Sequence, residues 1–320
     1  MKSPSSEIRR ARPLLGTIVE IGARGLKAST AIEAAFREIE TIHRLMSFHE
    51  SSSDISRVNR AEPGEIVHLD WRTHEVLADA QLMSRVSAGA FDVTVGGKLS
   101  EENVLPKPAQ AKRFDSKASF QDLILLPDHC ITLTRRAWID VGGIAKGYAV
   151  DRAAITLKKF GVVSAVVNAG GDLCVIGAAQ PVHIRHPENP SLTLPLGRIL
   201  NSAVASSSGC FNDRGHVHEI NDPLVEPRRN RRVNWRSSVT VIASRCIVAD
   251  ALTKVVRLAI RRAPRILSQF GARALIIDRR GLRVFEPDGK AGMANVLEAA
   301  ARIATAANYP SIPHQTLTGL

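Results

Sequence analysis

The stretch at 139–151, IDVGGIAKGYAVD, constrains the fold more than any other part of the chain. A short apolar β run ends at Ile139, and two adjacent glycines, Gly142 and Gly143, then allow a tight turn that side chains would obstruct. An apolar helical face follows the turn. A strand–turn–helix junction of this kind directs backbone N–H groups and the positive end of a helix dipole at one spot, where the usual guest is an anion such as phosphate.

Neither familiar phosphate-binding signature is present at this junction. In GGIAKG the lysine precedes the last glycine, so the segment is not GxxxxGK[ST], and the chain contains no GxGxxG. An acid, Asp140, and a lysine, Lys146, flank the glycines. A plain glycine turn with a surface ion pair between these two side chains is therefore the structural alternative to a binding site.

Composition is that of a soluble globular protein. The 320 residues are 44% hydrophobic and 23% charged. The sequence has no run of about 18 apolar residues, so we expect no transmembrane helix and no stable membrane insertion. The N-terminus lacks an apolar signal segment, and we expect a cytoplasmic protein. Four dispersed cysteines without a CxxC pair predict neither structural zinc nor a disulfide framework.

The net charge of +12 would suit a polyanionic partner. The densest basic run, PRRNRRVNWR at 227–236, has no interleaved aromatic residues and matches no known nucleic-acid motif. We interpret it as a solvated loop and expect no nucleic-acid partner. A phosphate-bearing small ligand would also benefit from the positive field.

Periodicity predicts strands grouped in meanders with helices between them. The predicted strands are 12–23, 123–126, 131–134, 137–139, 162–167, 182–185, 196–200, 237–243, 274–277 and 282–285. The predicted helices are 30–46, 55–59, 71–88, 144–157, 247–261, 264–270 and 291–306. This arrangement is typical of an α+β fold rather than a doubly wound sheet. We expect one domain over 1–310, with two intertwined lobes as a variant, and a flexible C-terminal tail over 311–320.

Four short stretches carry more chemistry than a scaffold needs, and each lies in a loop or at the start of a helix. They are AFD at 90–92, DxGGxxKG at 140–147, NAGGD at 168–172 and the acid Asp250. Carboxylates facing a phosphate-bearing ligand would repel it unless a hard cation such as Mg²⁺ lies between them. The pattern favours metal-assisted chemistry at a pyrophosphate. The structural alternatives are an Asp92 that caps a turn and an Asp250 that only favours a helix N-terminus.

Six segments occur in the order and approximate spacing of one known family. They are RPLLGT, MSFHESSSDISRVN, GAFDVTVGG, IDVGGIAKGYAVD, VVNAGGDL and SVTVIASRCIVADALTK. Together they resemble the ApbE family, the FAD:protein FMN transferases. The resemblance implies an α+β, T-fold-like domain with antiparallel sheets and packed helices that binds FAD and Mg²⁺. It also implies transfer of the FMN half of FAD to a threonine hydroxyl of a partner flavoprotein with release of AMP, or hydrolysis of FAD to FMN and AMP.

The resemblance implies roles for individual residues as well. The metal would be bound by the backbone carbonyl of Gly143 and by the carboxylate of Asp250. Residues 168–172 are typical of the family, and we assign them no direct contact. The residues that stand at FAD-contact positions are Leu15, His49, Ala90, Phe91, Asp92, Asp140 and Lys146.

The chain departs from the family pattern in two motifs and lacks the common secretion signal. The family helix usually reads DALxT, but here Lys254 stands at the threonine position and Thr253 one residue earlier. Thr253 is therefore a third candidate metal ligand, and Lys254 is expected to place its ammonium on a phosphate. The usual HIxDPxTG loop reads HEINDPLVEP, where His218, one residue out of register, is the candidate general base and His216 the fallback.

These departures leave three interpretations open. The first is Mg²⁺-dependent FMN transfer to an acceptor flavoprotein. The second is an FAD pyrophosphatase, which would give free FMN and AMP without an acceptor. The third is an FAD-binding protein that has lost catalysis, which would bind FAD tightly without turnover.

Overall fold

The computed structural model describes residues 6–187, 191–209, 224–229, 231–233, 237–278 and 281–286. His216, His218, the predicted helix 291–306 and the predicted tail 311–320 lie outside these residues. So do four positions of the basic run, 230 and 234–236.

The main sheet has eight strands, and every neighbouring pair in it is antiparallel. This pairing confirms the predicted α+β class, because a doubly wound sheet would be mostly parallel. In spatial order the strands are β1 (Ile8–Leu14), β2 (Thr17–Arg24), β6 (Ser164–Ala169), β7 (Asp172–Ile176), β10 (Ala203–Ser208), β13 (Ser237–Ala243), β14 (Arg273–Asp278) and β15 (Gly281–Phe285).

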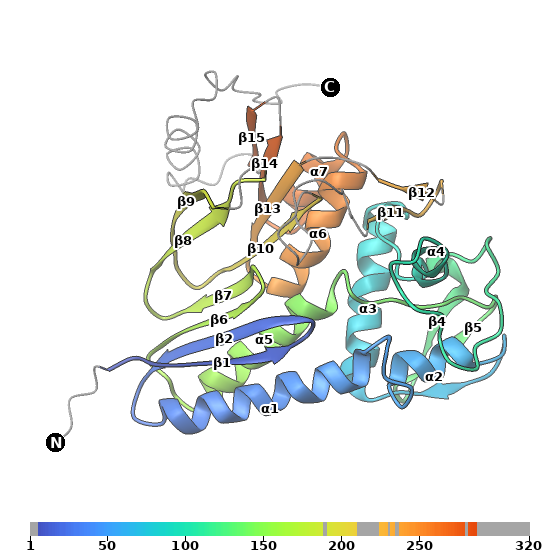
Figure 1. The fold of residues 1–320 in the computed structure, drawn as a ribbon, viewed down its shortest axis with the longest axis horizontal. Coiled ribbons are helices and arrows are strands. Elements are labelled where there is room, and N and C mark those ends of the chain that lie inside the picture. Colours follow the sequence, from blue (N-terminus) through green and yellow to red (C-terminus); the bar gives the residue numbers. More distant parts are fainter. Residues whose placement is uncertain are drawn as a thin grey trace.

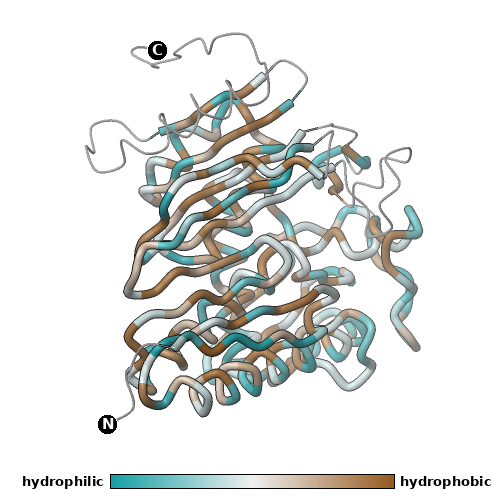
Figure 2. The backbone as a smooth tube through the Cα atoms, turned by 60° about the vertical axis from the view of Figure 1, so that its left-hand side comes forward, coloured by the Kyte–Doolittle hydropathy of each residue, from teal (hydrophilic) through white to brown (hydrophobic). Residues whose placement is uncertain are grey.

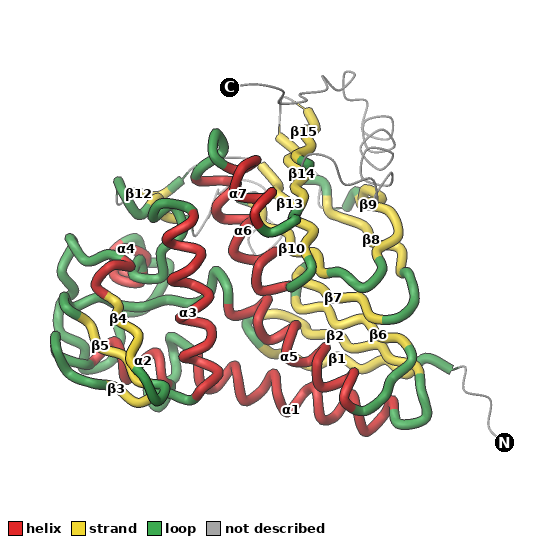
Figure 3. The backbone as a smooth tube through the Cα atoms, turned by 180° about the vertical axis from the view of Figure 1, so that it is seen from behind, coloured by secondary structure: helices red, strands yellow, loops and turns green. Residues whose placement is uncertain are grey.

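Helices cover one face of this sheet, and a hairpin covers part of the other (Figures 1 and 3). The hairpin strands bury an apolar face against β10, β13 and β14, so the sheet has a core on each side. Brown and paler segments alternate along the strands in Figure 2, as expected when successive side chains point to opposite faces. The helices are α1 (Ala28–Met46), α5 (Ala145–Lys159), α6 (Cys246–Leu258) and α7 (Ala263–Gln269), and the hairpin strands are β8 (Gln180–Arg185) and β9 (Thr193–Ile199).

A smaller group of elements, on the right in Figure 1, lies at one end of the helical layer. Its three-stranded sheet has the order β3-β5-β4. Its elements are α2 (Asp54–Arg60), β3 (Val67–His68), α3 (Trp71–Val86), α4 (Gly96–Glu101), a 3₁₀ turn at Phe120–Asp122, β4 (Leu123–Leu126) and β5 (Cys130–Leu133).

The described part of the basic run forms the short hairpin of β11 (Val225–Glu226) and β12 (Arg231–Arg232). Glu226 lies 3.7 Å from Arg229 and 3.6 Å from Arg231, which offsets part of the positive charge. Cys130, Cys174 and Cys246 are free and buried. None of the described helices is both long enough and apolar enough to cross a bilayer.

Three local predictions were wrong. The strand predicted over 12–23 is a hairpin, because a two-residue turn at Leu15 (φ 56°) and Gly16 (φ 71°) reverses the chain without interrupting the alternation. The third strand of the small sheet is β3, whereas residues 137–139 make only an isolated bridge between Trp138 and Val95. Helix α6 ends at Leu258 rather than at 261.

The N-terminus of α6 is capped by the preceding helix rather than by its own N-cap residue. Arg245, at the N-cap, makes no side-chain cap bond. Instead Asp151 of α5 accepts hydrogen bonds from the N–H groups of Cys246 (2.7 Å) and Ile247 (2.9 Å). Burial raises the pKa of Asp151 to about 6, against these two bonds, which lower it. This contact fixes how α6 lies on α5.

We expect Asp151→Ala to lower the free energy of unfolding by about 1–2 kcal/mol, because two helix N–H groups lose their acceptor. Urea denaturation followed by circular dichroism measures the loss. Asp79→Ala is the matched control, since Asp79 lies at the same helix end but pairs there with the exposed Arg245 side chain (2.8 Å). Its loss should stay below about 1 kcal/mol. Equal losses in the two variants would show that a nearby acid, not the cap, stabilises α6.

Candidate functional site

A cavity of about 290 Å³ lies between the 90–95 loop, the turn after Asp140 and α6. Among its lining residues are five that the sequence singled out: Ala90, Phe91, Asp92, Asp140 and Gly143. Lys254 lines it as well. Leu15 and His49 are not lining residues of this cavity. The structure therefore brings two of the four predicted stretches to this cavity, together with α6, the helix that carries Asp250.

The 90–95 loop reaches the turn because the two segments run side by side. The N–H of Asp140 donates to the carbonyl of Val93 (2.8 Å), and the N–H of Gly96 donates to the carbonyl of Trp138 (2.9 Å). A Cβ at position 96 would lie 2.5 Å from that carbonyl oxygen, so only glycine permits this approach. The backbone thus sets the position of Asp92 relative to Asp140.

The two cavity carboxylates are held differently. Asp92 accepts hydrogen bonds from Thr94, through N–H (2.8 Å) and Oγ1 (2.7 Å), and from the N–H of Phe120 (2.9 Å). These hydrogen bonds hold the loop that carries Asp92, which is the turn-capping role considered from the sequence as the alternative to FAD binding. Asp140 accepts a bond from the N–H of Gly142 (3.1 Å). Burial raises the pKa of both groups, and the backbone N–H bonds oppose the rise.

Next to the cavity, two buried carboxylates and two partly exposed ammonium groups form one network. Lys146 Nζ lies 2.6 Å from Asp172 Oδ2 and 3.7 Å from Asp250 Oδ2. Lys254 Nζ contacts Asp250 Oδ1 and lies 3.1 Å from the Asp250 carbonyl oxygen. The side chain of Asp250 is fully buried and that of Asp172 is 3% exposed. The formal charges of the four side chains balance.

These contacts shift the pKa values of the network in opposite directions. Burial alone would raise the pKa of Asp250, but the charges of Lys146 and Lys254 lower it below its usual range. Burial alone would lower the pKa of Lys146, but the charges of Asp250 and Asp172 raise it well above its usual value. Both shifts favour the charged forms of Lys146 and Asp250, whereas burial and the charge of Asp250 raise the pKa of Asp172. The surface ion pair between Lys146 and Asp140, considered from the sequence, is not the contact that forms.

Two residues of this region were missed by the sequence analysis. The sequence analysis assigned Asp172 no direct contact. Asp172 follows the second Gly-Gly pair of the chain, as an acid also adjoins the first pair, and this repeated pattern could have indicated its role. The turn depends on Gly170 (φ 64°) and Gly171 (φ 103°), whose N–H bonds to Asn168 Oδ1 at 3.0 Å. Arg257 is buried and lines the cavity one helical turn beyond Lys254. In the sequence, only the helical spacing of Arg257 from Asp250 and Lys254 indicates that the three residues lie on the same face of α6.

A close crossing of α5 and α6 places Asp250 in the network. The N–H of Gly147 donates to Asp250 Oδ2 (3.0 Å). A Cβ at position 147 would lie 2.4 Å from the carbonyl oxygen of Cys246. Glycine is therefore required where the two helices cross.

Two of the three predicted metal donors, Asp250 and Thr253, are already hydrogen-bonded within the protein. Lys254 holds one oxygen of Asp250, and the Gly147 N–H holds the other. Thr253 is fully buried and donates its hydroxyl proton to the Asp250 carbonyl (2.7 Å). Within the described ranges, no group of three or more His, Cys, Asp or Glu side chains could hold a metal ion.

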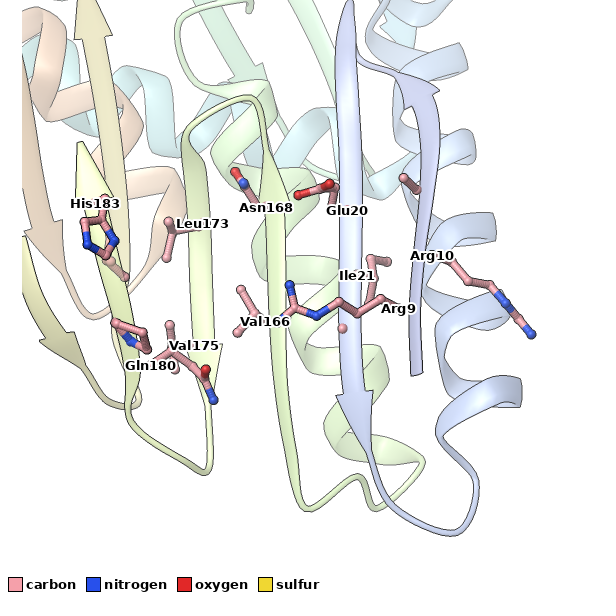
Figure 4. Close-up of a pocket in the computed structure, with 14 residues that line it drawn as sticks. Arg9, Arg10, Glu20, Ile21, Val166, Asn168, Leu173, Val175, Gln180 and His183 are labelled. Atoms are coloured by element: carbon pink, nitrogen blue, oxygen red, sulfur yellow. The ribbon is translucent and has the colours of Figure 1, made fainter. Parts of the chain in front are cut away.

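A larger cavity of about 450 Å³ lies on the opposite face of the main sheet, between β1, β2, β6, β7 and β8 (Figure 4). Arg9, Glu20, Asn168 and His183 are among its lining residues. None of the predicted FAD or metal residues lines it. The smaller cavity, with its buried charges and glycine turn, is therefore the candidate site despite its size.

The sequence model of the ApbE family matches residues 15–276, which is most of the chain. The chain belongs to the ApbE family. This confirms the identification that the six motifs gave. The family match begins at the turn of the first hairpin and ends within β14, so it includes every described element of the candidate site.

Curated relatives and solved structures agree with this assignment. A Vibrio cholerae protein named FAD:protein FMN transferase is 25% identical over 271 residues, covering 78% of this chain and 81% of that protein. A Haemophilus influenzae protein of the same name is 26% identical over 261 residues, covering 73% and 72%. The crystal structure of the ApbE protein from Thermotoga maritima, 24% identical, superposes with a TM-score of 0.74 over 88% of this chain and 97% of that one. The fold predicted for an ApbE protein is confirmed.

The network next to the cavity is testable by a double-mutant cycle at Lys146 and Asp172. Lys146→Met leaves the buried carboxylate of Asp172 without its nearest partner, and we expect it to cost about 3 kcal/mol of stability. Asp172→Ala leaves a lysine whose side chain is 31% exposed and still lies 3.7 Å from Asp250, so it should cost less, about 1–2 kcal/mol. The double variant should cost at least about 1 kcal/mol less than the sum of the two. Urea denaturation of the four proteins gives the coupling. Additive losses would show that the two side chains do not interact.

Proposed function

We propose that this ApbE family protein transfers the FMN half of FAD to a threonine hydroxyl of an acceptor flavoprotein and releases AMP. The observation that carries the proposal is the meeting of the 90–92 loop, the Asp140 turn and α6 at one cavity. Lys254 and Arg257 bring positive charge to its wall. Such a wall suits a pyrophosphate, since fixed cations and turn N–H groups stabilise charge on phosphate oxygens. The names of the curated relatives support the same reaction.

The proposed step exchanges one bond at phosphorus for another. The threonine Oγ attacks the FMN phosphorus and forms a P–O bond. The bond from this phosphorus to the bridging oxygen breaks, and AMP leaves with the electron pair. The threonine proton passes to a base, for which His218 stays the prediction. Positive side chains on the cavity wall lower the barrier because negative charge grows on the AMP phosphate as it leaves.

Mg²⁺ is the cation that the sequence predicts for this step. Its predicted donors are the Gly143 carbonyl, Asp250 and Thr253, and the described contacts already engage two of them, Asp250 and Thr253. Asp250 is occupied by Lys254 and the Gly147 N–H, and the Thr253 hydroxyl is turned back to its own helix. The positive charge at this position comes from the chain itself.

Incubating the protein with FAD, Mg²⁺ and an acceptor flavoprotein domain should give AMP and an acceptor that stays fluorescent after denaturation. Chromatography measures AMP, and in-gel fluorescence measures labelling. Replacing the acceptor threonine by valine removes the attacking hydroxyl and should abolish labelling. Free FMN and AMP without an acceptor would identify an FAD pyrophosphatase. FAD binding without any AMP would identify a protein that has lost catalysis.

Asp140→Asn should weaken FAD binding by about tenfold, because one of the two oxygen acceptors of this cavity side chain is replaced by an NH₂ donor. Quenching of flavin fluorescence measures the affinity. Asp128→Asn makes the same chemical change in the exposed turn between β4 and β5 and should leave the affinity unchanged. Equal affinities of the Asp140→Asn variant and the unmodified protein would remove Asp140 from the proposed FAD contacts.

A further inference from the structure

Lys254 stands where the family helix usually carries a threonine, and its side chain changes what Asp250 can bind. The ammonium contacts Asp250 Oδ1 and lies 3.1 Å from the Asp250 carbonyl oxygen. We infer that this ammonium group replaces a divalent cation in the chain, so that flavin transfer proceeds without a bound metal ion. The inference rests on the proposed function and says which group supplies the positive charge that the transfer reaction needs at the pyrophosphate.

The two cations exclude each other on steric grounds. Mg²⁺ binds carboxylate oxygens at about 2.0–2.1 Å and demands near-octahedral coordination. The space next to Asp250 Oδ1 is filled by the ammonium, and Oδ2 accepts the N–H of Gly147. The hydroxyl of Thr253 cannot compensate, because it is fully buried and bonded to the Asp250 carbonyl.

Charge balance gives the same answer. Asp172 and Asp250 supply two negative charges, and Lys146 and Lys254 already neutralise them. A divalent ion added at Asp250 would place two further positive charges within a few ångströms of two ammonium groups. Like charges at such distances in a buried site repel each other strongly. The network is complete without a metal.

Arg257 supplies a second positive group on the same wall. It follows Lys254 by one turn of α6, is 6% exposed and lines the same cavity. Its Nη1 lies 3.4 Å from Ser207 Oγ, at the end of β10. Lys254 and Arg257 together carry two formal positive charges, of which Asp250 offsets one. Guanidinium and ammonium groups both bind phosphate oxygens, so the pair can hold the pyrophosphate and stabilise the leaving AMP phosphate.

The inference is tested by measuring AMP release in EDTA and in Mg²⁺. For the unmodified protein with FAD and the acceptor domain, the two rates should agree within about twofold. Lys254→Thr restores the oxygen at the family position. It should lose at least about tenfold in EDTA and recover in Mg²⁺, because the metal site becomes open. Lys254→Arg keeps the charge, so whatever its absolute rate, its rates in EDTA and in Mg²⁺ should agree within about twofold.

A second readout does not depend on turnover. Isothermal titration with MgCl₂ should give binding heat for Lys254→Thr and none for the unmodified protein, and Mg²⁺ should raise the Tm of that variant only. Lys159→Thr, an exposed lysine at the end of α5, is the control and should behave like the unmodified protein.

The outcomes separate this inference from the proposed function. AMP release by the unmodified protein that stops in EDTA would overturn metal independence and leave the transfer reaction standing. No AMP in either buffer would overturn the transfer reaction, and the titration would still decide the question of the cation. Mg²⁺ binding to the unmodified protein would then refute the inference.

Discussion

The buried carboxylate of Asp250 is the constraint on which the rest of the site depends. A charge without solvent costs several kcal/mol unless partners surround it. Its partners are the Gly147 N–H and Lys146 from α5, and Lys254 from α6 itself. Because two of the three come from the neighbouring helix, α5 and α6 must cross closely. The glycine at 147 permits that crossing, so electrostatics and backbone sterics together set the helix pair.

The main sheet supplies the last member of the network, in addition to those from α5 and α6. The turn between β6 and β7 delivers Asp172 to Lys146, while Asp151 on α5 caps the first turn of α6. Backbone hydrogen bonds between the 90–96 loop and residues 138–140 bring the wall of the cavity against the same helices. Segments far apart in the chain thus meet at one small volume, where charged side chains are shielded from water. Shielding strengthens each charged contact and makes a missing partner costly.

Sequence patterns predicted the positions of helices and strands better than they predicted which strands pair and where the chain reverses. Strong periodicity located α1, α3, α6 and β13, because each buries one clear apolar face or lies fully in the core. Alternation could not reveal the reversal at Leu15, since a two-residue turn preserves the pattern across it. The two-residue strand β3 carries too short a pattern to detect, and its pairing with β5 depends on the tertiary structure.

By itself the sequence determined the α+β class, the family and the residue types gathered at the site, because motifs and apolar periods are local properties of a chain. The tertiary structure decided which charges pair. Lys146 pairs with Asp172 rather than with its sequence neighbour Asp140, and Lys254 holds an acid that the motif assigns to a metal. Those pairings follow from the close helix crossing and from the need to neutralise charge away from water. The spacing of residues along the chain shows neither the helix crossing nor which charges are buried together.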